Sequence, residues 1–173
     1  ESNFPLEVLS QGLQVRVQAA EASVEQDRNC ILNAISGKSL HAEPDKNHPA
    51  FDSMNATLHG IFAVAAWPQA VQKKQVTALG LPSALRADLK RLELHFSFFG
   101  IEEMTDSECE TLASSLPPNL QDLSLDFDGT TVSDAGCVAL ARAIERLECL
   151  VSVKLIFRTT ANTIGNSGMA GIV

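Results

Sequence analysis

Apolar side chains recur at helical spacing along the first third of the chain. They fall at steps of three and four residues on one helix face, continue to about Ile35 and stop at Gly37. This pattern predicts a helix over about 6–36, which Gly12 or the polar stretch 25–29 bends or breaks. We interpret the stripe as packing against the chain's own second helix, with a coiled-coil seam for a partner helix as the alternative.

A polar stretch with two prolines follows at 38–49 and predicts a loop. Helical spacing then resumes and predicts a second helix over about 50–66, with a continuation beyond residue 66 left open. Pro68 is expected to kink or end this helix, because proline has no amide hydrogen and its ring crowds the preceding turn. Trp67 is expected to be buried at the helix end, with an exposed anchor for a partner as the alternative. Residues 1–80 are therefore predicted to form a helical leader of two helices.

Three segments in the second half of the chain repeat one alternation of apolar and polar residues. Each has the form LxxLxLxF, with Val153 in place of one leucine, and the copies start at Leu89, Leu120 and Leu150, offset by 31 and 30 residues. Alternation with period two is typical of a strand. We expect Leu92, Leu123 and Val153 to lie side by side in adjacent parallel strands.

A second matching stretch follows each strand-like segment, at 104–113, 132–141 and 164–173. Thr105 and Ser133, each followed by an aspartate, suit helix N-caps in the first two copies. Each repeat unit is thus predicted to be a strand, a turn and a helix. One unit cannot bury its own apolar face, so the units are expected to stack.

These motifs resemble the leucine-rich repeat family, in the ribonuclease-inhibitor-like class with a helix on the outer face. The resemblance covers about 85–173 and is closest over 120–144, LQDLSLDFDGTTVSDAGCVALARAI. It implies an α/β fold: a short solenoid of parallel strands with outer helices at 81–173, in about three units with the last one incomplete, after an α-helical hairpin. The segments 31–37 and 55–67 also resemble the helical leader of leucine-rich-repeat proteins from dinoflagellate algae, which implies no known activity.

The sequence departs from the family pattern at three points. Ser97, Asp128 and Arg158 stand where the family has an asparagine that forms a hydrogen-bonded ladder. The units are slightly longer than the usual length of about 20–29 residues. The third unit ends at Val173 inside its expected helix, so we expect either that the native chain continues or that a partner covers this end.

The residues between the inward leucines are expected to share the open, concave face of the repeats. They carry both signs of charge and form a patch able to contact a protein partner, with a solvated sheet surface as the alternative. The nine residues are Arg91, Glu93, His95, Asp122, Ser124, Asp126, Ser152, Lys154 and Ile156.

The charge balance narrows the class of partner. The formal net charge is −8, from 21 acidic and 13 basic side chains, which argues against nucleic acid and against an anionic membrane surface. No apolar stretch approaches the roughly 20 residues that span a bilayer, so we expect no direct membrane span, with a peripheral position on a membrane complex left open. The chain begins at Glu1 rather than methionine, so we expect a processed chain or a fragment.

The four cysteines, Cys30, Cys109, Cys137 and Cys149, include no CxxC pair. We expect free, buried thiols and a reducing compartment, cytoplasmic or organellar, with a plastid among the candidates.

Candidate chemistry is weak throughout the sequence. HExxH, GxSxG, Walker-type and kinase motifs are missing. Cys109 and His95 are expected on opposite sides of the repeat, separated by core. The acids Asp122, Asp126 and Asp128 lack a glycine-punctuated calcium loop and suit a solvated face, and Gly165-Asn-Ser-Gly168 suits a turn before a helix. We expect no catalytic residue, metal or cofactor.

The sequence therefore predicts a non-catalytic protein-interaction or scaffold module, a subunit or accessory factor of a larger assembly. An organelle or photosynthetic complex fits the algal resemblance. One alternative is a regulatory fragment of a larger enzyme whose catalytic part lies outside this chain. Another is an enzyme that uses Cys109 or Cys137.

Overall fold

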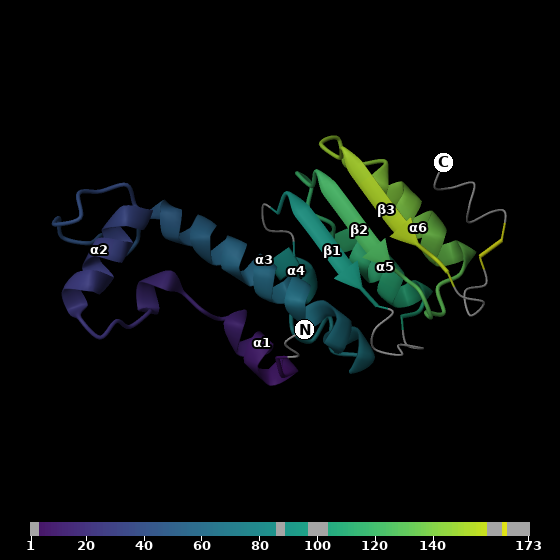
Figure 1. Cartoon of the computed structure of the whole chain (residues 1–173), viewed down its shortest axis with the longest axis horizontal. Helices are drawn as coiled ribbons and strands as arrows, with labels where there is room; N and C mark the ends of the chain where they lie inside the picture. Colours follow the sequence, from purple (N-terminus) through teal and green to yellow (C-terminus); the bar gives the residue numbers. More distant parts are fainter. Residues whose placement is uncertain (1–3, 86–88, 97–103, 159–163, 166–173) are drawn as a thin grey trace.

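The computed structural model describes residues 4–85, 89–96, 104–158 and 164–165. Three strands form one layer, helices form a second layer behind it, and a helical arm extends away from both (Figure 1). The elements in chain order are α1 (Leu6–Gly12), the 3₁₀ helix η1 (Val17–Ala19), α2 (Glu25–Ile35), α3 (Pro49–Gln72), α4 (Leu81–Leu85), β1 (Arg91–His95), α5 (Asp106–Ser115), β2 (Asp122–Asp126), α6 (Asp134–Ile144) and β3 (Ser152–Ile156).

The helix predicted over 6–36 is interrupted, and the break lies at Gly12, where α1 ends. The alternative break at 25–29 is wrong, because this stretch forms the start of α2. Between α1 and α2 the chain makes only short turns and the 3₁₀ helix η1, and it also bonds to α3: the amide of Val17 donates to Asn55 Oδ1 at 2.8 Å. These bonds to α3 explain why the apolar spacing does not give one continuous helix.

Helix α3 begins at Pro49, and the ring of His48 accepts a hydrogen bond from the Ala50 amide at 3.2 Å. The helix continues through Pro68 to Gln72, so the alternative in which Pro68 ends the helix is wrong. Trp67 is 0% exposed, as the sequence predicts, and its neighbours in this turn are buried as well. Their burial offsets the one amide hydrogen bond that Pro68 cannot make.

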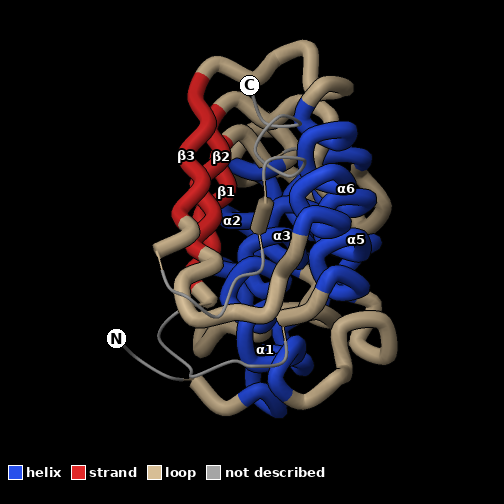
Figure 2. The backbone as a smooth tube through the Cα atoms, turned by 90° about the vertical axis from the view of Figure 1, so that its right-hand side faces the viewer, coloured by secondary structure: helices blue, strands red, loops and turns tan. Residues whose placement is uncertain are grey.

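The strands form a parallel sheet in the order β1-β2-β3. The register pairs Leu92 with Leu123 and Leu123 with Val153, which confirms the sequence prediction for these three residues. Helices α5 and α6 form the crossovers and lie on one side of the sheet (Figure 2). The order of strand, helix, strand, helix, strand agrees with an α/β fold.

Coverage of the sheet decreases toward β3. Leu92 and Leu123 are each 1% exposed, whereas Val153 at the matching position is 44% exposed. The helix expected over 164–173, which would cover β3 from behind, lies outside the described residues except for Ile164 and Gly165.

The predicted N-caps of the two outer helices are confirmed. The Thr105 amide donates to the Glu108 carboxylate at 3.2 Å, and Ser133 Oγ accepts from the Ala135 amide at 3.3 Å. The aspartate after each cap, however, binds the next unit of the repeat. We call Asp106 and Asp134 the inter-repeat carboxylates.

The inter-repeat carboxylates make equivalent contacts. Asp106 accepts from the Ser133 amide at 2.7 Å, the Ser133 hydroxyl at 2.6 Å and the Gly136 amide at 3.0 Å. Asp134 accepts from the amide of Gly165 at 2.6 Å. Ser133 and Gly165 occupy the same position in successive copies of the repeat, so the contact recurs from one unit to the next.

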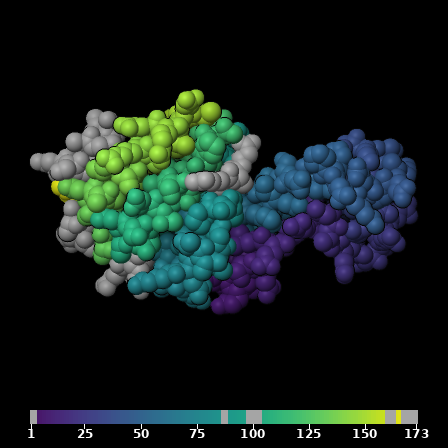
Figure 3. Space-filling view, turned by 180° about the vertical axis from the view of Figure 1, so that it is seen from behind, coloured from purple at the N-terminus to yellow at the C-terminus, as the bar shows by residue number. Residues whose placement is uncertain are grey.

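One hydrophobic core joins the leader to the sheet, because Leu6 of α1 and Trp67 of α3 belong to the same buried cluster as the inward leucines. Within this cluster Phe127 stacks between Phe96 and Phe157, with ring centroids 5.4 and 5.2 Å apart. Helix α2 and the first half of α3 lie outside this body and form the arm (Figure 3).

Candidate protein-interaction surface

The strand register brings all nine predicted surface residues onto one face of the sheet, here called the open strand face. They form three rows across the strands, each with one residue from β1, β2 and β3. Every one of the nine is exposed or half-buried, in contrast to the buried leucines of β1 and β2 that alternate with them. The rows are Arg91, Asp122 and Ser152; Glu93, Ser124 and Lys154; and His95, Asp126 and Ile156.

Polar side chains on the β1 side of the open strand face contact one another. The guanidinium group of Arg91 lies 3.6 Å from the Glu93 carboxylate, and His95 lies 3.2 Å from Glu93 and 3.7 Å from Asp126. These side chains are mostly half-exposed or more, and exposed ion pairs stabilise a fold by only about 0–1 kcal/mol. Their arrangement therefore matters for the surface that a partner meets more than for stability.

A hollow of about 270 Å³ lies in the middle of the open strand face, between the first two rows. Asp122 and Lys154 line it, and neither side chain has a hydrogen bond or ion pair with any other residue that the structure describes. They sit on adjacent strands, two positions apart along the sheet. The hollow thus presents one uncompensated negative charge and one uncompensated positive charge.

Neither candidate cysteine is set up as a nucleophile. Burial raises the pKa of the Cys109 thiol far above its ordinary value, and the neighbouring Cys137 and Asp106 raise it further. Burial, followed by Asp134 and Asp106, raises the pKa of Cys137 to about 11. Since the thiolate is the reactive form, both side chains stay protonated and inert near neutral pH.

Cys109 and His95 lie on opposite sides of the sheet, as the sequence predicts. Cys109 is fully buried in α5, whereas His95 is half-buried on the open strand face. In the described part of the chain, no group of three or more His, Cys, Asp or Glu side chains is arranged to hold a metal ion. Asp122 and Asp126 share the face without forming such a group.

All four cysteines are free, as predicted. The expectation of burial is met at Cys109 and Cys137, but it is wrong for Cys149, which is exposed, and Cys30 is only half-buried. Cys149 lies in the turn between α6 and β3, outside the helical pattern that places the other two in the core. Ser97, one of the three residues in place of the family asparagine, lies outside the described residues.

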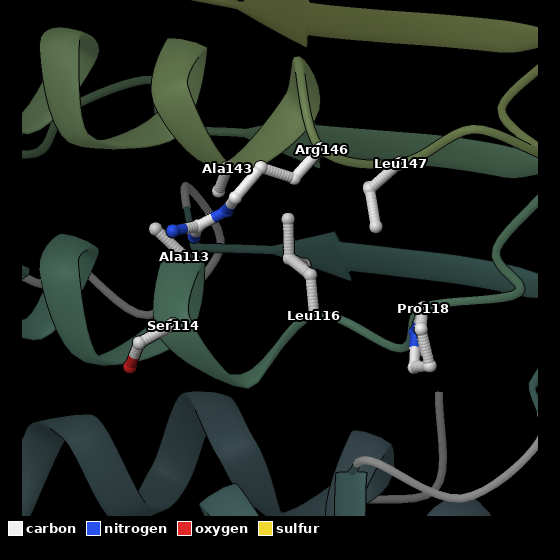
Figure 4. Close-up of a pocket in the computed structure, with 7 residues that line it drawn as sticks. All are labelled: Ala113, Ser114, Leu116, Pro118, Ala143, Arg146 and Leu147. Atoms are coloured by element: carbon white, nitrogen blue, oxygen red, sulfur yellow. The ribbon is translucent and has the colours of Figure 1, made fainter.

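Sequence reasoning missed a second hollow, of about 450 Å³, between the C-terminal ends of α5 and α6 (Figure 4). Its residues lie at or just after the ends of two helices that begin 28 positions apart in the chain, at Asp106 and Asp134, so no local motif marks it. The one signal in the sequence is Arg146, a cation that follows the apolar end of α6.

Comparison with protein-family models, with curated proteins and with solved structures gave no match. Of the helices in the described residues, none is both long and apolar enough to cross a lipid bilayer.

Proposed function

We propose that this chain is a non-catalytic interaction module that binds a protein partner through the open strand face. The observation that carries this proposal is the hollow of that face, where Asp122 and Lys154 stand uncompensated among aligned polar side chains. Complementary charges on a partner would satisfy both groups and fix its orientation on the sheet.

A leucine-rich-repeat stack is the architecture we propose for residues 81–173. The repeat offsets of 31 and 30 residues coincide with the strand register, so each copy supplies one strand. Two contacts recur at each step, the stacked phenylalanines and the inter-repeat carboxylates. Such stepwise repetition is typical of a stack in which each unit contacts only its neighbours.

A protein partner fits this surface better than a small ligand. The hollow is open, and its lining combines three acidic or basic groups of β1 and β2 with the ammonium group of Lys154. Rims of mixed polarity around a modest hollow are common where two proteins meet. We propose that the partner belongs to a larger assembly, and the algal resemblance of the leader favours an organelle or photosynthetic complex.

Site-specific photocrosslinking tests the proposal. A p-benzoylphenylalanine residue at Ser124, in the middle of the open strand face, should crosslink one stoichiometric partner from an extract of the native source. The same residue at Glu110, exposed on the opposite helix layer, is the matched control and should not crosslink this partner. Equal crosslinking at both positions, or none at Ser124, would contradict the assignment of the surface.

A further inference from the structure

The hollow between α5 and α6 has an apolar floor. Ala113 and Ala143 lie near the ends of α5 and α6, and Leu116 and Leu147 lie just after those ends. Each of the four is less than 10% exposed as a residue, although together they line a space of about 450 Å³. The hollow therefore offers apolar side chains to an occupant within the usual size range of ligand pockets, about 300–1,000 Å³.

Among the described residues that line this hollow, Arg146 is the one with a charged side chain. It extends from the end of α6 across the floor in the direction of Ala113 (Figure 4). Its guanidinium group makes no hydrogen bond or ion pair with the described residues. A planar group with five donors thus lies beside an apolar floor with its donors unused.

We propose that this hollow is a second docking site, which seats an aliphatic side chain of a partner polypeptide and binds an adjacent carboxylate through Arg146. The apolar floor selects the aliphatic group, and the free guanidinium group selects the acid, which it can bind with two parallel hydrogen bonds. A polypeptide fits because the hollow is open on one side instead of being an enclosed cavity.

The position of the hollow makes Arg146 decisive for an acidic occupant. The hollow lies at the C-terminal ends of α5 and α6, where the last carbonyl groups carry partial negative charge. Without Arg146 these helix ends would disfavour a carboxylate. Loss of the guanidinium group should therefore lower the affinity for an acidic peptide by at least about tenfold.

The site is independent of the open strand face, because it lies on the helix layer behind the sheet. One partner could occupy both sites, but each site is tested by its own variant, so one proposal can be wrong while the other holds. Asp122→Lys changes only the open strand face, and Arg146→Gln changes only the hollow between the helices.

A random dodecapeptide phage library is the probe that tests this proposal. The library is selected on the immobilised full chain and depleted on its Arg146→Gln variant. The surviving peptides should share an aliphatic residue next to aspartate or glutamate. A selected peptide is then synthesised with a fluorescent label, and its affinity is measured by fluorescence anisotropy. The affinity for Arg146→Gln should be at least about tenfold lower than the affinity for the wild type.

Three variants control the experiment. Arg142→Gln removes an exposed cation one turn earlier on α6, outside this hollow, and should leave the affinity unchanged. Ala113→Leu fills the floor while keeping Arg146 and should weaken binding, with circular dichroism showing that the variant is folded. Asp122→Lys should bind as the wild type does.

Three results would overturn the proposal: no peptide survives depletion, the survivors lack a carboxylate, or Arg142→Gln weakens binding as much as Arg146→Gln. If the peptide binds Asp122→Lys more weakly than it binds the wild type, its binding site is on the open strand face instead.

Discussion

At the scale of single residues, Asp106 shows how one side chain joins two repeat units. Burial of its carboxyl group raises the pKa, but hydrogen bonds from Ser133 and Gly136 outweigh this effect, and the pKa lies below its ordinary value of 3.8. The aligned sequence indicates an acid near the helix cap. It does not indicate that the acid binds the following unit, because this depends on how far apart two helices pack.

Asp106→Ala should lower the free energy of unfolding by about 2 kcal/mol at pH 7, because three hydrogen bonds to a charged acceptor are lost. Since the folded-state pKa is depressed, the contribution is complete above the unfolded pKa of about 3.8 and disappears as the pH falls through the folded value. Urea unfolding at pH 7 and at pH values below 4 would show the difference from wild type shrinking.

Glu110→Ala is the control for this prediction, since Glu110 is exposed on the same helix and should change stability little. A difference between Asp106→Ala and wild type that stays constant down to the lowest pH would contradict the assigned role of the carboxylate.

At the scale of secondary-structure elements, the sheet was predictable and the helices of the leader were less so. The strand register follows from the alternation around Leu92 and Leu123, because a slip of one residue would expose every inward leucine. The length of α3 does not follow from local pattern, since burial of Trp67 by distant residues decides whether the helix passes Pro68. Tertiary packing also sets the break at Gly12.

The phenylalanine column gives a prediction at this scale. Phe127→Ala should cost about 3–5 kcal/mol, because its ring is 0% exposed and stacks on both neighbours. Phe157→Ala should cost about half as much, since Phe157 is half-buried at the β3 side. Equilibrium unfolding in urea measures both losses. Equal losses would show that the column is not buried as described.

The close approach of α1 to α3 gives a second prediction at the scale of secondary-structure elements. A Cβ atom on Gly12 would collide with the ring of Phe62, so Gly12→Ala should destabilise the protein by about 1–3 kcal/mol. The cost should fall when Phe62→Ala is combined with it, because the smaller side chain removes the collision. Thermal unfolding of the two single variants and the double variant measures this coupling, and strictly additive effects would rule out the collision.

At the scale of the whole molecule, the leader and the repeats depend on one core. The sequence pattern separates them near residue 80, yet Trp67 and Val71 of α3 are buried in the same cluster as Leu92 of β1. The repeat motif does not predict this contact, because it joins a helix of the leader, α3, to a strand, β1. The open strand face could be named residue by residue from the repeat, whereas the hollow at Arg146 needed the packing of α5 on α6.

The shared core predicts how fragments behave. A fragment of residues 81–173 should lack a cooperative thermal transition, because removal of α3 exposes the buried side of β1. A fragment of residues 49–173 keeps α3 and should retain a transition at a lower temperature than the full chain. Circular dichroism melts compare them directly. If 81–173 melts cooperatively, the leader is not part of the core.

Helix α3 runs without interruption from the tip of the arm into the core, over 24 residues. A helix of 24 residues is about 36 Å long. Helix α3 therefore sets the distance between α2 and the sheet. Any protein that grips both α2 and the body must have a matching span, and two spin labels placed at these points should report one narrow distance distribution.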